Sequence, residues 1–92
     1  MMLKDTVEMM CSEDYKERFR AEYYQLKERY ERLRAFNIKI EAAKWADCSD
    51  EKLDIEMPKH DCPDQLLREQ EEAMSEYLKV LEIRAVLEGI VL

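Results

Sequence analysis

The stretch DYKERFRAEYYQLKERYERLRAF, residues 14–36, decides the fold of this chain. Its large apolar side chains recur at alternating steps of four and three residues, the spacing of one face of an α-helix. A helix with such a stripe is stable in water only when another element covers the stripe. The stretch therefore predicts a long helix that needs a partner, with these residues facing it: Phe19, Tyr23, Leu26, Tyr30 and Leu33.

The composition favours long amphipathic helices over strands joined by turns. The 92 residues include one Gly and two Pro, and 40% are charged while 47% are apolar. A helical hairpin of this size buries little surface, so we expect a single domain, residues 1–92, that self-associates. No apolar run reaches the roughly 18 residues of a membrane span, and the N-terminus does not resemble a signal peptide, which predicts a soluble cytoplasmic protein without a membrane partner.

Periodicity divides the chain into four segments: a short helix over about 2–10, a long helix over about 14–43, a connector over about 44–61 and a second long helix over about 62–88. Asp14 and Glu17 have the spacing of a capping pair at the start of the first long helix. Gly89 is placed to end the second one. The predicted fold is all-α, a short N-terminal helix followed by a long antiparallel helical hairpin that oligomerises.

The second long helix has a broad apolar face interrupted by polar residues. Down the middle of this face runs a row spaced by sevens, Gln70, Tyr77 and Arg84. With Phe36 near Leu66, antiparallel pairing would bring Glu22 close to Arg84 and Arg29 close to Tyr77. We therefore expect four residues in the seam between the long helices: Glu22, Gln70, Tyr77 and Arg84. The predicted apolar face consists of Leu66, Leu67, Ala73, Met74, Val80, Leu81 and Leu87.

Two further features point to self-association. Asn37 stands where the stripe of the first long helix calls for an apolar residue, and a polar residue at such a position often fixes register or oligomeric state. Residues 90–92 form an apolar tail, which we expect to be exposed and to dock onto another surface.

The connector contains the residue types of a metal or nucleophile site, Cys48, His60 and Cys62. Their spacing matches no standard zinc site, and no third group orients His60 towards a thiol. The odd set of three cysteines predicts free thiols. No spacing selects one pair among the many carboxylates, so we expect neither an enzyme, nor a metal, nor a cofactor. The net charge of −7 argues against binding of polymeric nucleic acid.

Rings and cations interleave along the first long helix. Rings beside cations can stack on a nucleobase and pair with a phosphate, although the same mixture also serves helix–helix interfaces. Both readings stay open from the residues alone. The residues concerned are Tyr15, Tyr23, Tyr24 and Tyr30 with Lys16, Arg18, Arg20, Lys27 and Arg29.

Both long helices resemble the family of small phage helical-hairpin proteins that includes the anti-CBASS type 2 cyclic-oligonucleotide sponge, a hairpin shared with a Thoeris anti-defence sponge. The resemblance rests on two runs of residues. The first is Tyr15, Glu17-Arg18, Glu22, Leu26, Arg29 and Leu33, and the second is Leu67, Gln70, Met74, Tyr77, Leu81 and Arg84.

The resemblance implies a phage protein in the cytoplasm of the infected bacterial host. It implies a homo-oligomer, a hexamer in the sponge, that sequesters cyclic di- and trinucleotide immune signals between subunits without hydrolysing them. By motif position, Tyr15 would stack on a base and Arg29 would meet a phosphate, with Lys27 as the nearby alternative and Arg18 assisting. The connector here is longer and more acidic than the family's short turn.

Two other functions remain open. One is a small phage inhibitor that binds a host protein through the acidic connector and the Trp45 region. The other is a structural helical hairpin without a ligand.

Overall fold

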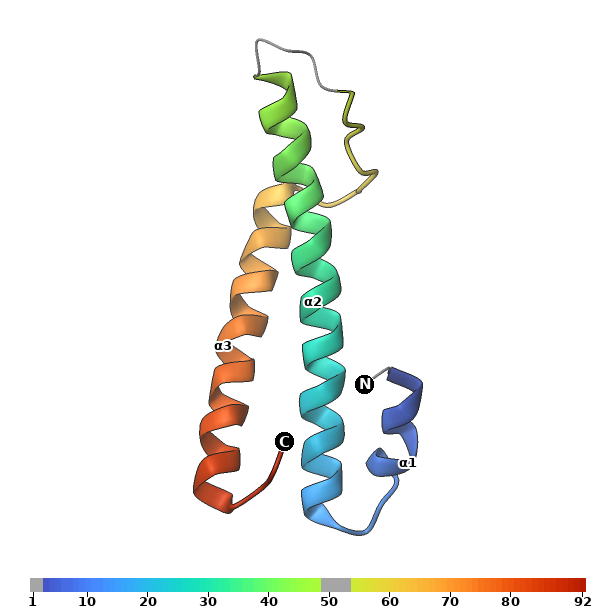
Figure 1. Cartoon of the computed structure of the whole chain (residues 1–92), viewed down its shortest axis with the longest axis vertical. Helices are drawn as coiled ribbons and strands as arrows, with labels where there is room; N and C mark the ends of the chain where they lie inside the picture. Colours follow the sequence, from blue (N-terminus) through green and yellow to red (C-terminus); the bar gives the residue numbers. More distant parts are fainter. Residues whose placement is uncertain (1–2, 49–53) are drawn as a thin grey trace.

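The computed structural model describes residues 3–48 and 54–92. The chain forms a 3-10 turn over Leu3–Thr6, α1 over Val7–Met10, α2 over Tyr15–Asp47 and α3 over Asp64–Glu88. α2 and α3 run antiparallel, and α1 packs on α2 and not on α3 (Figure 1). None of the described residues lies in a strand. The predicted all-α fold, with a short N-terminal helix before a long hairpin, is confirmed.

The N-terminal segment is not one continuous α-helix. The Thr6 hydroxyl donates to the Leu3 carbonyl over 2.6 Å, which favours the tighter 3-10 turn ahead of α1. Thr6 is also the buried residue of this segment, and its hydroxyl accepts a hydrogen bond from the Gln25 amide on α2. The spacing of Leu3, Val7 and Met10 in the sequence predicts one apolar side for this helix, but Val7 and Met10 are exposed.

α2 begins at its predicted cap and ends later than expected. The Asp14 carboxylate accepts a hydrogen bond from the Lys16 amide over 3.0 Å, while the Asp14 amide donates to the Ser12 hydroxyl, so Ser12 takes the role expected of Glu17. The helix passes its expected end near residue 43 and stops at Asp47, since the last residues include alanines and no glycine or proline. Trp45 therefore lies on α2, not in the connector.

α3 has the predicted end and a slightly later start. Pro63 is the residue before the first helical position, and the helix begins at Asp64 instead of residue 62. The Lys44 ammonium pairs with Asp64, which joins the start of α3 to the last turns of α2. Gly89 ends the helix with a φ of 71°, a left-handed conformation that glycine adopts readily.

One cluster of buried residues holds the hairpin together, at the end opposite the connector. The stripe predicted for α2 faces α3: Phe19 and Tyr23 are buried, and the other three residues are half-buried. On α3 the predicted face splits into two stripes. Leu67, Met74 and Leu81 turn towards α2, whereas Leu66, Val80 and Leu87 are exposed. The cluster consists of Phe19, Tyr23, Leu78, Leu81, Ala85 and Ile90.

The exposed stripe of α3 has a geometric cause. A single neighbouring helix covers an arc of roughly 100° of another, so α2 can cover one of the two apolar stripes of α3 but not both. The C-terminal tail also differs from the expectation: Ile90 is only 5% exposed and belongs to the cluster, while Val91 remains exposed. The tail thus docks partly onto its own chain.

Within residues 3–48 and 54–92, neither long helix combines the length with the hydropathy that a bilayer-spanning segment requires.

Candidate functional site

Aromatic and charged side chains meet where α2 begins and α3 ends. The Tyr15 hydroxyl donates to Glu88 Oε1 over 2.9 Å and accepts from Arg84 Nη2 over 2.6 Å. Arg84 also pairs with Glu88 over 3.0 Å and lies 5.1 Å from the centroid of the Phe19 ring. We call these four residues, Tyr15, Phe19, Arg84 and Glu88, the Tyr15 cluster.

The helix caps place this cluster. Asp14 fixes Tyr15 as the first residue of α2, and Gly89 ends α3 directly after Glu88. Because the helices are antiparallel, the start of one faces the end of the other (Figure 1). The result is a tyrosine ring, 45% exposed, held by two side chains of the opposite helix.

The electrostatics of the cluster keep both groups protonated at neutral pH. The hydrogen bond from Tyr15 to the Glu88 carboxylate raises the pKa of the phenol, and partial burial adds to this rise. The hydrogen bond to the same carboxylate raises the pKa of Arg84. Tyr15 is therefore a neutral ring and Arg84 a full cation. Arg84 uses two of its N–H groups within the cluster, which leaves others for an anion.

A second pair lies one heptad further along. The Tyr77 hydroxyl donates to Glu22 Oε1, and this hydrogen bond raises the pKa of Tyr77. Glu22 thus bonds to Tyr77 and Arg84 bonds to Tyr15 and Glu88, in place of the expected pairs Glu22 with Arg84 and Arg29 with Tyr77. Glu22, Tyr77 and Arg84 are all exposed, and long side chains at the open edge of a helix pair can reach either neighbour. Gln70, the fourth residue expected in the seam, is exposed.

The basic residues predicted to bind a ligand are distributed along α2. Arg18 donates to the Ser12 carbonyl over 2.8 Å, and Lys27 lies 6.0 Å from the centroid of the Tyr23 ring. Arg29 is exposed and, among residues 3–48 and 54–92, has no hydrogen bond or ion pair. The separation of fourteen positions between Tyr15 and Arg29 corresponds to about 21 Å of helix. The structure does not bring Tyr15 and Arg29 together within one chain.

Arg84 and Glu88 complete the cluster, but the spacing rules assigned Arg84 to the seam and gave Glu88 no role. Their separation of four residues is the spacing of a helical ion pair, and this was the available signal. What the spacing alone does not show is that Tyr15 lies beside them, because that depends on where the two helices begin and end.

The connector residues do not converge. The His60 ring nitrogen Nδ1 lies 2.8 Å from the Pro58 carbonyl, and the ring packs edge-on against Phe36 with 6.0 Å between centroids. Cys48 follows α2, Cys62 precedes α3, and both thiols are exposed and free. In the described part of the chain, no three His, Cys, Asp or Glu side chains gather in a way that could hold a metal ion. Of the predicted connector over about 44–61, residues 49–53 lie outside the described residues.

The chain matches one known protein family. The Sequestin family model matches residues 13–87, which include α2, the connector and nearly all of α3. This match confirms the resemblance to a family of sequestering, sponge-type proteins. No curated protein and no solved structure matched the chain.

Proposed function

Because the chain belongs to the Sequestin family, we propose that it is a phage anti-defence protein that sequesters cyclic oligonucleotide immune signals in the cytoplasm of the infected host. The ligands are cyclic di- or trinucleotides, and the protein holds them without hydrolysis. Its effect follows from mass action, since a sponge lowers the free concentration of a signal only when it matches the signal in amount and binds it more tightly than the receptor does.

The observation that carries this proposal is the geometry of the Tyr15 cluster. Its tyrosine ring is partly exposed and fixed by Arg84 and Glu88, so little conformational freedom is lost when a base stacks on it. The neighbouring guanidinium supplies the planar donors that suit a phosphate. A ring for the base and a cation for the phosphate thus stand side by side.

The spacing of the basic residues supports a site built from more than one subunit. A single ligand that contacts both Tyr15 and Arg29 must take Arg29 from another copy of the chain, because about 21 Å of helix separates the two residues. Lys27 is also far from Tyr15, about 18 Å along the helix, so a ligand on Tyr15 would take Lys27 from another copy as well. Arg29 has no partner of its own among the described residues, which leaves its charge available to a neighbouring subunit's ligand.

A surface suited to self-association is present on α3. Its second apolar stripe stays uncovered in the single chain, and Val86 is 82% exposed. Exposed apolar area of this kind is unfavourable in water and is typical of oligomer interfaces. We propose that another copy of the chain covers it. The exposed apolar residues of α3 are Leu66, Val80, Ile83, Val86 and Leu87.

The test is a titration of the purified protein with a panel of cyclic di- and trinucleotides, followed by calorimetry, with light scattering for the size of the assembly. We expect submicromolar binding, about 8 kcal/mol or more of binding free energy, to a multimer. Tyr15→Ala and Arg29→Ala should each weaken binding at least about tenfold, since each removes a stacking or charge-assisted contact. Arg32→Ala is the matched control for Arg29, because Arg32 is paired with Glu28 on the exposed side of α2. Absence of heat with every nucleotide at high protein concentration would refute the proposal.

One observation favours the alternative, a small inhibitor that binds a host protein. Trp45 is 73% exposed near the end of α2, and an exposed tryptophan is a frequent anchor of protein interfaces. For such an inhibitor, Trp45→Ala and neutralisation of Asp47 should abolish capture of the host protein, whereas Tyr15→Ala should not. The sponge shows the reverse dependence in the nucleotide titration.

A further inference from the structure

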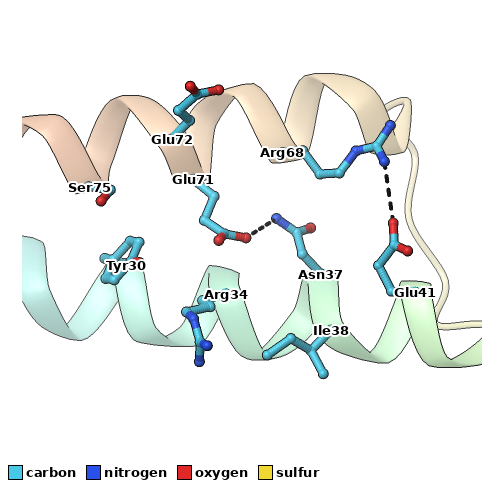
Figure 2. Close-up of a pocket in the computed structure, with 9 residues that line it drawn as sticks. All are labelled: Tyr30, Arg34, Asn37, Ile38, Glu41, Arg68, Glu71, Glu72 and Ser75. Carbon is cyan, nitrogen blue, oxygen red and sulfur yellow. Dashed lines mark hydrogen bonds and ion pairs between the residues drawn. The ribbon is translucent and has the colours of Figure 1, made fainter.

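A groove of about 510 Å³ lies between α2 and α3 in the half of the hairpin next to the connector. Figure 2 shows it in close-up, with Glu71 and Tyr30 directed into the space between the two helices. The groove is far from the Tyr15 cluster: Asn37, at its centre, lies 22 residues along α2 from Tyr15, about 33 Å of helix. The groove is therefore a separate feature of the molecule.

Asn37 has an unused acceptor in this groove. The side chain is 5% exposed, and its amide nitrogen Nδ2 donates to the Leu67 carbonyl over 3.2 Å and to Glu71 Oε1 over 2.9 Å. Both partners are acceptors, so the orientation of the amide is determined: exchanging its oxygen and nitrogen would set oxygen against oxygen. The oxygen Oδ1 is buried and has no hydrogen-bond partner among the described residues. Buried acceptors of native proteins are nearly always paired, so this atom calls for a donor.

The charges around the groove favour a cationic donor. Two of the charged side chains, Arg34 and Glu72, point away from the space between the helices, and Arg68 is paired with Glu41 over 3.3 Å (Figure 2). Glu71, by contrast, turns its carboxylate to the Asn37 amide. The charged side chains that line the groove are Glu41, Glu71, Glu72, Arg34 and Arg68.

We propose that this groove binds a linear aliphatic amine, with one ammonium group donating to Asn37 Oδ1 and to the carboxylates of Glu71 and Glu41. An ammonium group carries three N–H donors and no acceptor. Its three donors can therefore pair with the amide oxygen of Asn37 and with one carboxylate on each side of it.

Entry to the buried Asn37 Oδ1 requires the pair of Arg68 and Glu41 to open. Figure 2 shows this oxygen on the side of Asn37 where Arg68 and Glu41 pair. The Arg68 side chain is 51% exposed, and exposed ion pairs contribute little to stability. The incoming ammonium group takes the place of Arg68 beside Glu41, and Arg68 turns to solvent.

The length of the groove indicates more than one amino group. Tyr30 lines its other end, seven residues from Asn37, which is about 10 Å along α2. Ser75 lies at the same end on α3, opposite Tyr30 (Figure 2). A second ammonium group at this distance meets a hydroxyl and an aromatic ring, and cations are attracted to the faces of such rings.

The experiment is a calorimetric titration of the full chain with spermidine in about 150 mM salt, where non-specific attraction to an acidic surface is screened. We expect one saturable site per chain. Glu71→Gln and Asn37→Leu should each weaken binding at least about tenfold, the effect of losing one hydrogen bond to a charged group. Thermal melts of both variants establish that they fold. If Asn37→Leu unfolds, Glu71→Gln still decides the outcome, because Glu71 is half-buried and its carboxylate stays partly hydrated.

Glu69→Gln is the matched control. Glu69 is exposed on the same helix, lies outside the groove and carries the same charge. It should weaken spermidine binding less than about twofold if the groove is the site, as expected for a distant screened charge. Equal weakening by Glu69→Gln and Glu71→Gln would mean that spermidine is only a counterion, and would overturn the proposal. So would the absence of saturable binding, or binding of AMP in place of spermidine, which would assign the groove to a nucleobase.

Discussion

The two ends of the hairpin differ in the side chains that fill the seam between α2 and α3. At the end where α2 begins, rings and branched side chains fill the seam, and the Tyr15 cluster ties the helices together across its edge. At the connector end, the seam contains a buried amide, Asn37. The other buried residues of α2 at this end are Ile40 and two small residues, Ala43 and Ala46. The first end is a core with a candidate site at its edge, and the second is a thinner core with a groove.

This difference teaches where stability and binding capacity lie in a small domain. Large buried side chains contribute most of the free energy of folding, so the loss of one at the first end should destabilise the protein more than a loss at the connector end. A buried acceptor without a hydrogen bond lowers the free energy of unfolding until a donor pairs with it. The candidate site therefore lies at the edge of the strong core, and the groove lies inside the weak one.

The largest effect expected is that of Leu81→Ala. Leu81 is 1% exposed in the apolar cluster, so its truncation should lower the free energy of unfolding by about 2–5 kcal/mol. Leu67→Ala, at the connector end where Leu67 is only half-buried, should cost less, about 1–2 kcal/mol. Urea unfolding of both variants measures the difference. Equal losses would show that the two ends are equally strong.

Gly89→Ala tests the turn that folds the tail onto the first end. Apart from the adjoining backbone, no atom of the described residues lies within 4 Å of the position that a Cβ would occupy at Gly89, so the cost is only that of the left-handed conformation, about 1–2 kcal/mol. Gly89→Asn should cost less, since asparagine tolerates this conformation better. Thermal melts of the two variants rank them, and an alanine variant as stable as the parent would contradict the assigned cap.

The smallest effect concerns the titration of Tyr15. The Glu88 carboxylate raises the pKa of Tyr15, so Glu88→Gln should lower this pKa towards its ordinary value of about 10. Because the folded-state pKa lies above the unfolded one, the stabilising contribution of this hydrogen bond is present below pH about 10 and disappears as the pH rises through the folded-state pKa.

The phenolate absorbance, taken as a difference against Tyr15→Phe, isolates this titration. Glu82→Gln is the control, because Glu82 accepts a hydrogen bond from Tyr23 over 3.3 Å and does not touch Tyr15. A Tyr15 pKa that stays the same in Glu88→Gln would show that the cluster is not held together at this contact in solution.

Local signals in the sequence were sufficient for much of the fold. The Asp14 cap, the stripe from Phe19 to Leu33 and the stop at Gly89 depend on a few neighbouring residues each, and the structure contains all three. The face of α3 was only half predictable. Leu66 and Leu67 are equally apolar, and the choice between them depends on which stripe α2 reaches.

The candidate site was less predictable than the fold. Tyr15 and Arg84 were both singled out, but for different roles, because their contact depends on the lengths of α2, α3 and the connector together. The prediction that α2 ends near residue 43 was wrong, because residues 44–47 include no helix-breaking residue and the helix continues to Asp47. The unpaired oxygen of Asn37 has no sequence signal beyond an amide at an apolar position.

The position of Asn37 and Tyr15 along the chain also bears on the order in which the hairpin forms. The hydrogen bonds of Asn37 to α3 close loops of 30 and 34 residues, whereas those of Tyr15 to Arg84 and Glu88 span 69 and 73 residues. The entropy lost on closing a loop grows with its length, so contacts beside the connector form first, and each turn paired there shortens the loop that remains to be closed. We therefore expect the helices to zip from the weaker end towards the stronger one, and the Tyr15 cluster to assemble last.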